Sequence, residues 1–169
     1  VDKLLGVGDY RVHRYADLVA GETLSLEEMR QLPATSHDDL RLSRALEQLG
    51  RGRHFVIDYP ATAAVLARLD PTDQNVARRF ELVIDGLEIA NGYFELTDPK
   101  AHRERFAADQ QARAAQGLSE VVADRRFLAA IDAGLPSCAG VALGFDRLLQ
   151  LRLGAGSLQE VQAFGWARR

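Results

Sequence analysis

A β-hairpin signal near the middle of the chain constrains the fold more than any other feature. The segment "RFELVIDGLEIANGYFEL", residues 79–96, consists of two β-rich runs on either side of Asp85-Gly86. An Asp-Gly pair between such runs is typical of a two-residue hairpin turn. The sequence therefore predicts an antiparallel hairpin here, in a chain of 169 residues whose 47% hydrophobic content suffices for a core.

Helices and strands alternate along the rest of the chain. Asp98-Pro99 supplies an N-cap and a first-turn proline for a long polar helix that stops at Gly117. Residues 61–69 are compatible with either a helix or a loop. Helical periodicity and strand patterns predict helices at 24–32, 38–50, about 99–116, 124–134 and 145–154, and further strands at 54–60 and 138–144. The fold class expected is α+β.

Composition excludes several functional classes. A net charge of −3 provides no basic field for nucleic acid, so we expect no binding to DNA. The single cysteine, Cys138, excludes an internal disulfide, and no apolar run approaches the roughly 18–20 residues of a membrane span. We therefore expect a cytoplasmic protein without membrane segments. Because the chain begins at Val1, we also expect it to be part of something longer.

The hairpin register places two glutamates on one face. With a two-residue turn, Val83 lies opposite Glu88 and Glu81 lies opposite Ala90. Glu81 and Glu88 are then diagonal neighbours close enough to repel each other. Such a pair needs a cation, a shared proton or open water, and a divalent metal with phosphate ligands is one solution. The alternative is two solvated glutamates on the exposed side of an amphipathic hairpin.

Three further polar or aromatic residues follow in the second strand. Asn91, Tyr93 and Glu95 alternate with one another but are out of phase with Glu88. A β-bulge near Asn91-Gly92 would bring them all to one side. An amide, a ring and a carboxylate suit a ligand with an ammonium group and an apolar stem. Alternatively, Tyr93 belongs to the core and Glu95 caps or pairs locally.

A strand that runs directly into a helix forms the second candidate site. In "GVALGFDRLLQLRLGAG", residues 140–156, glycines bound the strand and Arg147 lies in the first helical turn. There its guanidinium joins the positive end of the helix dipole, which suits a polyphosphate. The alternative is an ion pair of Arg147 with Asp146 or with a glutamate of the hairpin.

These strings resemble a known family. "RFELVIDGLEIANGYFELTD" followed by "RERF", and "GVALGFDRLLQLRLGAGSLQEVQAF" near the end, resemble the C-terminal catalytic half of a class II lysyl-tRNA synthetase. The second string resembles the third class II motif, with "ALGFDR" where "GMGIDR"-like strings are usual. "EIANGYFELTD" and "GLPSCAGVALG" are closer to the truncated GenX/PoxA paralogues, which attach β-lysine to elongation factor P. The resemblance implies a class II antiparallel β-sheet flanked by helices.

The resemblance also implies roles for particular residues. Glu81 and Glu88 would hold the Mg²⁺ that accompanies ATP, and Arg147 would contact the ATP phosphates. Glu95 would receive the side-chain ammonium of lysine or (R)-β-lysine. The other implied substrate contacts are Asn91 and Tyr93, which orient the amino acid, Ala90, whose methyl group shapes its pocket, and Gly140 and Gly144, which leave room for it and for the nucleotide.

Two motifs of the family are not recognisable. The first class II motif, which builds a dimer interface, and the second, whose arginine contacts the α-phosphate, are absent from residues 1–53. We therefore predict a helical N-terminal or insertion segment over 1–53 and the C-terminal part of the catalytic domain over 54–169. The complete parent would be a homodimer, and this chain alone would be inactive.

Three functions remain open from the sequence. The first is an AMP-forming ligase that transfers lysine or β-lysine to a lysine of elongation factor P. The second is a catalytic fragment of a lysyl-tRNA synthetase that charges tRNA-Lys. The third is a non-catalytic module, although the presence of Glu81, Glu88, Glu95 and Arg147 together argues against it.

Overall fold

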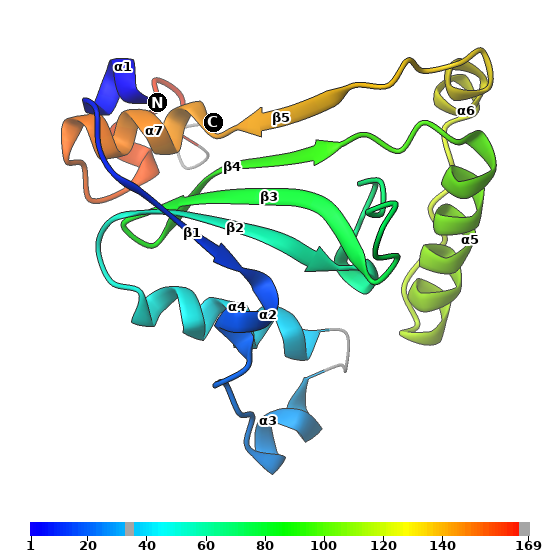
Figure 1. Ribbon diagram of the computed structural model, residues 1–169, viewed down its shortest axis with the longest axis horizontal. Helices are drawn as coiled ribbons and strands as arrows, with labels where there is room; N and C mark the ends of the chain where they lie inside the picture. Colours follow the sequence, from blue (N-terminus) through cyan, green and yellow to red (C-terminus); the bar gives the residue numbers. More distant parts are fainter. Residues whose placement is uncertain (33–35, 166–169) are drawn as a thin grey trace. The chain divides into compact units, whose positions relative to one another are not determined.

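The protein is described here by a computed structural model that covers residues 1–32 and 36–165 (Figure 1). The residues group into two compact units, the first comprising 1–59, 80–92 and 141–169 and the second 60–79 and 93–140. Residues 33–35 and 166–169 lie outside the described part. The division into a segment over 1–53 and part of a catalytic domain over 54–169 stays a prediction.

A five-stranded sheet in the order β1-β2-β3-β4-β5 is the central element. Its strands are β1 (Tyr10–Arg14), β2 (Arg53–Pro60), β3 (Val76–Ile84), β4 (Leu87–Phe94) and β5 (Ala139–Leu143). The first two strands are parallel, with Tyr10 opposite Arg53 and Arg14 opposite Ile57. The sheet is therefore mixed, and the α+β class is confirmed.

The predicted hairpin is present. β3 ends at Ile84 and β4 begins at Leu87, so only Asp85 and Gly86 form the turn. Both have positive φ, 50° and 81°, as a primed two-residue turn requires. Asp85 also anchors the turn, because its carboxylate accepts a hydrogen bond from the backbone N–H of Gly52 at 2.8 Å.

The first unit contains several helices, which are α1 (Asp2–Leu5), α2 (Tyr15–Val19), α3 (Leu26–Gln31), α4 (His37–Gln48), α7 (Phe145–Leu153) and the 3₁₀ turn η3 (Leu158–Glu160). Residues of α1 and α7 pack on the hairpin. Leu148 of α7 is buried against Leu82, Ile84, Ile89 and Ala90 of the hairpin. α7 ends at Gly154, whose φ of 64° is the left-handed conformation expected of a helix-ending glycine. The start of α7 is thus fixed relative to β4.

The second unit contains α5 (Pro99–Ala115), α6 (Arg125–Asp132) and the 3₁₀ turn η2 (Ala61–Ala63). The predicted cap of α5 is confirmed, since the Asp98 carboxylate accepts hydrogen bonds from the backbone N–H groups of Lys100 and Ala101. The helices contact each other through the rings of His102, Phe106 and Phe127. Residues 61–69, left open by the sequence, form one short turn and then loop. No helix in the described ranges is long and apolar enough to cross a membrane.

Candidate active site

The predicted site residues divide between the two units. Those of the first unit are Glu81, Glu88, Ala90, Asn91, Gly144 and Arg147, and those of the second are Tyr93, Glu95 and Gly140.

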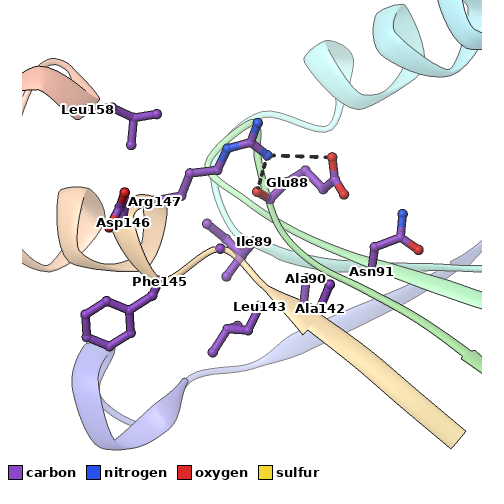
Figure 2. A pocket seen from close by; sticks show the side chains of 11 residues that line it. Glu88, Ile89, Ala90, Asn91, Ala142, Leu143, Phe145, Asp146, Arg147 and Leu158 are labelled. Carbon is purple, nitrogen blue, oxygen red and sulfur yellow. Dashed lines mark hydrogen bonds and ion pairs between the residues drawn. The ribbon is translucent and has the colours of Figure 1, made fainter. Parts of the chain in front are cut away.

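A cavity of about 540 Å³ lies where β4, the end of β5 and the start of α7 meet (Figure 2). Five of the six residues of the first group line it. The remainder of the wall is mainly apolar, with Ala142, Leu143, Phe145 and Leu158 among its residues. A mostly apolar hollow with a few polar groups at its edge is the usual form of a small-molecule site.

Arg147 is held against the hairpin. Its Nη1 donates to the backbone carbonyl of Glu88 at 2.7 Å and lies 3.6 Å from Oε2 of the same residue (Figure 2). The alternative of an ion pair with a hairpin glutamate is therefore seen in the structure. Asp146 instead accepts a hydrogen bond from Gln162 at 2.8 Å. Among the described residues only Nη1 of the Arg147 guanidinium has a partner, so its other nitrogens remain available as donors.

Gly144 connects β5 to α7 beside this arginine. Its N–H donates to the Ile89 carbonyl at 2.8 Å, and its φ of −74° is open to any residue. A methyl group added there would meet its nearest neighbours at 3.5 Å, which is an ordinary contact. The fold does not require a glycine at this position, so any requirement would come from a bound molecule.

Glu81 and Asn91 form a second polar pair. Asn91 Nδ2 donates to Glu81 Oε1 at 3.1 Å, and Glu81 is 9% exposed. The two side chains are therefore within hydrogen-bonding distance of each other, and the bulge near Asn91-Gly92 stays a prediction. Asn91 Oδ1 is buried and has no hydrogen-bond partner in the part of the chain that the structure describes. A buried acceptor without a donor is costly, so this oxygen is suited to an N–H group of a ligand.

In the described residues, no group of three or more His, Cys, Asp or Glu side chains could hold a metal ion. Glu81 and Glu88 provide hard oxygen donors, as Mg²⁺ prefers, but only two carboxylates. Their chemistry fits a magnesium ion that takes its remaining ligands from phosphate and water. It does not fit an all-protein metal site.

Glu95, in the second unit, directly follows β4. Its N–H donates to the Cys138 carbonyl at 3.0 Å, and it forms an antiparallel bridge with Ala67. The side chain is half-buried, and its carboxylate makes no hydrogen bond or ion pair with any described residue. Local capping or pairing of the Glu95 side chain is thus not observed within residues 1–32 and 36–165. A half-buried carboxylate without a partner is suited to an incoming cation.

Gly140 lies directly against the Glu95 side chain. A methyl group at this position would overlap the Glu95 carboxylate. The sequence-based expectation assigned the space at Gly140 to a ligand, and the structure shows that the carboxylate itself occupies the adjoining space. Tyr93, two residues before Glu95, is half-buried, and the Arg79 guanidinium lies 5.8 Å from its ring centre. This cation–π contact holds the ring.

Sequence reasoning missed two features of the sites. Phe145 and Leu158 line the cavity although neither was singled out, because an apolar residue carries no local signal of a cavity. His102 lies within a helix predicted to be polar, yet it is buried, with 3% exposure. The only feature of the sequence that could have indicated this burial was a single histidine within a polar helix.

The family of class II tRNA synthetases (D, K and N) matches residues 21–168. The chain belongs to this family. The family assignment made from the signature strings is therefore confirmed.

Three relatives carry the name elongation factor P–(R)-β-lysine ligase. That of Klebsiella pneumoniae is 52% identical over 110 residues, which are 65% of this chain and 34% of the relative. That of Vibrio cholerae is 48% identical over 114 residues, 68% of this chain and 35% of the relative. That of Salmonella gallinarum is 41% identical over 150 residues, 85% of this chain and 46% of the relative. This chain therefore spans between a third and a half of the length of these relatives.

Proposed function

We propose that the complete protein to which this sequence belongs activates lysine or (R)-β-lysine with ATP and transfers it to a lysine of elongation factor P. The observation that carries the proposal is the cavity at the start of α7, where Arg147 lies beside Glu88 and keeps free N–H donors. Membership in the class II tRNA synthetases (D, K and N) and the names of the three relatives support it.

The cavity would take the nucleotide. The free guanidinium nitrogens of Arg147 would donate to ATP phosphate oxygens, and the N-terminal end of α7 adds a positive dipole. Glu81 and Glu88 would hold Mg²⁺, which neutralises phosphate charge when it is bound with ATP. Glu88 Oε2, which lies 3.6 Å from Arg147 Nη1, would be a ligand of that metal, and Arg147 would be a donor to the phosphates. Gly144 leaves the wall of the cavity without a side chain.

The amino acid would be held by its charged and polar ends. We propose that Glu95 receives the side-chain ammonium, and that Gly140 keeps the space that the Glu95 carboxylate needs. In the first unit, Asn91 Oδ1 is suited to accept from an amino group of a ligand. In the second unit, Tyr93 is suited to contact an apolar stem. Ala90 is buried in the cavity wall, where its methyl group would narrow the space for that amino group.

The proposed reaction has two steps, and both depend on how the reacting groups are aligned. An oxygen of the amino-acid carboxylate attacks the α-phosphorus of ATP, and pyrophosphate leaves with the electron pair of the broken P–O bond. The ε-amine of a lysine on elongation factor P then attacks the adenylate carbonyl, AMP leaves, and an amide forms with loss of a proton from nitrogen. Arg147 stabilises charge that develops on the phosphate, and no side chain forms a covalent intermediate.

Adenylate formation tests the proposal. The complete protein is incubated with ATP and either (R)-β-lysine or L-α-lysine, and pyrophosphate release is measured; elongation factor P and tRNA-Lys are then supplied separately as acceptors. The proposal expects adenylate and transfer to elongation factor P, and no transfer to a variant of that factor without its acceptor lysine. Charging of tRNA-Lys instead would identify a synthetase, and no adenylate with either amino acid would identify a non-catalytic module.

A further inference from the structure

The backbone that carries Glu95 is held by one buried side chain of another element. Nε2 of His102, on α5, lies 2.6 Å from the carbonyl oxygen of Leu96, the residue after Glu95. A carbonyl only accepts, so Nε2 must carry the hydrogen and donate it. Nδ1 of the same ring is buried and has no hydrogen-bond partner in the part of the chain that the structure describes.

The remaining bonds around Glu95 come from the backbone. The N–H of Glu95 donates to Cys138, and the N–H of Leu96 donates to Leu66, each at 3.0 Å. Among the described residues, the His102 bond is the side-chain contribution to this set, and it joins the segment to α5. Since the Glu95 carboxylate has no partner among the described residues, its position depends on the backbone that carries it.

The His102 ring is itself held in place. It packs edge-on against Phe106 of α5, with ring centres 6.1 Å apart, and against Phe127 of α6, at 5.8 Å. A buried ring between two aromatic neighbours has little freedom to rotate. The Nε2–H group is therefore a fixed donor and not a mobile one.

We propose that His102 is a positioning residue for Glu95, which sets where the carboxylate meets the side-chain ammonium of the amino-acid substrate. The inference rests on the proposed function, in which Glu95 receives that ammonium. Loss of the donor would leave the Leu96 carbonyl unpaired and let the segment at residues 95–96 shift. Because a misplacement of about 1 Å can cost about 100-fold in rate, we expect a smaller shift of the carboxylate to cost about tenfold.

Two substitutions separate the donor from the ring. His102→Phe keeps the aromatic packing and removes the N–H, whereas His102→Gln keeps an N–H donor of similar reach and removes the ring. In the complete protein we expect His102→Phe to raise the KM for lysine or β-lysine about tenfold, with the KM for ATP unchanged. His102→Gln should restore the amino-acid KM to within about twofold of wild type, even where its melting temperature is lower.

Phe106→Leu is the matched control, because it removes one of the two ring contacts of His102 and keeps the N–H donor and the contact with Phe127. It should lower the melting temperature without changing the amino-acid KM. If His102→Phe leaves the amino-acid KM unchanged, or raises the KM for ATP equally, the positioning role is wrong. Should His102→Phe fail to fold, His102→Gln decides, since a purely structural role predicts that its amino-acid KM rises together with its loss of stability.

The outcomes also separate this inference from the proposed function. If wild type forms no adenylate with either amino acid, the proposed function fails, and the inference fails with it. If wild type is active and Glu95→Gln raises the amino-acid KM while His102→Phe does not, only the positioning role is overturned.

Discussion

Two glutamates of the candidate sites have opposite surroundings. The Glu88 carboxylate has the Arg147 guanidinium 3.6 Å away, whereas the Glu95 carboxylate has no partner in the described part of the chain. The side chains of Glu88 and Arg147 are both partly exposed, so their ion pair contributes little to the stability of the fold. These surroundings favour different roles: Glu88 is paired with a cation of the protein, whereas Glu95 is open to a cation of the substrate.

Glu95→Gln tests the second role. The substitution keeps size and hydrogen bonding but removes the charge, so the KM for lysine or β-lysine should rise about 10- to 100-fold, or about 1.5–3 kcal/mol. The KM for ATP should hardly change, and the melting temperature should stay equal or rise because an uncompensated charge is gone. Steady-state kinetics with each amino acid, together with thermal melting, measure both. An unchanged amino-acid KM with a lower melting temperature would make Glu95 a structural residue.

Arg147→Lys tests the phosphate contact. Lysine keeps the charge and can still donate to the Glu88 carbonyl, but it cannot reproduce a forked contact with phosphate oxygens. Adenylate formation should fall about tenfold or more while the melting temperature changes little. Arg152→Lys in the last turn of α7 is the control and should behave as wild type. Normal turnover by Arg147→Lys would leave only the observed contact with Glu88.

At the level of elements, α3 depends on a capping box. The Ser25 hydroxyl accepts from the N–H of Glu28, and the Glu28 carboxylate accepts from the N–H of Ser25. The same carboxylate pairs with Arg44 of α4. Hydrogen bonds from the Ser25 backbone, from Arg44 and from the Ser25 hydroxyl lower the pKa of Glu28 to about 2. One carboxylate therefore both caps α3 and joins it to α4.

The stability of this region should depend on pH through Glu28. Because the folded-state pKa is lowered, the ionised form stabilises the fold above the unfolded pKa near 4.5, and that contribution is lost as pH falls toward about 2. Glu28→Gln should lower the melting temperature at pH 7 and flatten its decline between about pH 5 and pH 2. Glu27→Gln, one residue earlier and outside the box, is the control. A decline as steep in Glu28→Gln as in wild type would contradict the assignment.

At the level of the whole molecule, this chain spans only 34–46% of the length of the relatives described above. The cavity beside Arg147 is bordered by apolar side chains that remain exposed, with Phe145 62% and Leu143 46% accessible. A site that must exclude water and align two substrates is poorly served by such an open wall.

We therefore expect the isolated 169 residues to bind ATP weakly and to form no adenylate. Lysine-dependent ATP–pyrophosphate exchange measures this directly, with a full-length elongation factor P–(R)-β-lysine ligase such as that of Klebsiella pneumoniae as positive control. Exchange by the isolated chain at the rate of that control would show that the two unrecognised motifs are dispensable.

The sequence by itself determined the elements whose signals are local. Asp85-Gly86 specifies its turn because a primed turn needs positive φ at both positions, and Asp98-Pro99 specifies the start of α5 because an aspartate caps free N–H groups. The signature strings likewise determined the family, since they report a shared ancestry and not a contact. Each of these signals is complete within a few consecutive residues.

Only the tertiary structure decided which groups meet. β1 pairs in parallel with β2 across about forty residues, and a short strand carries no information about so distant a partner. The structure also decided that Arg147 contacts Glu88 and not Asp146. It likewise decided that His102 bonds to the Leu96 carbonyl. Hydrogen-bond partners depend on how packed elements orient their side chains, and that orientation follows from burial over the whole molecule.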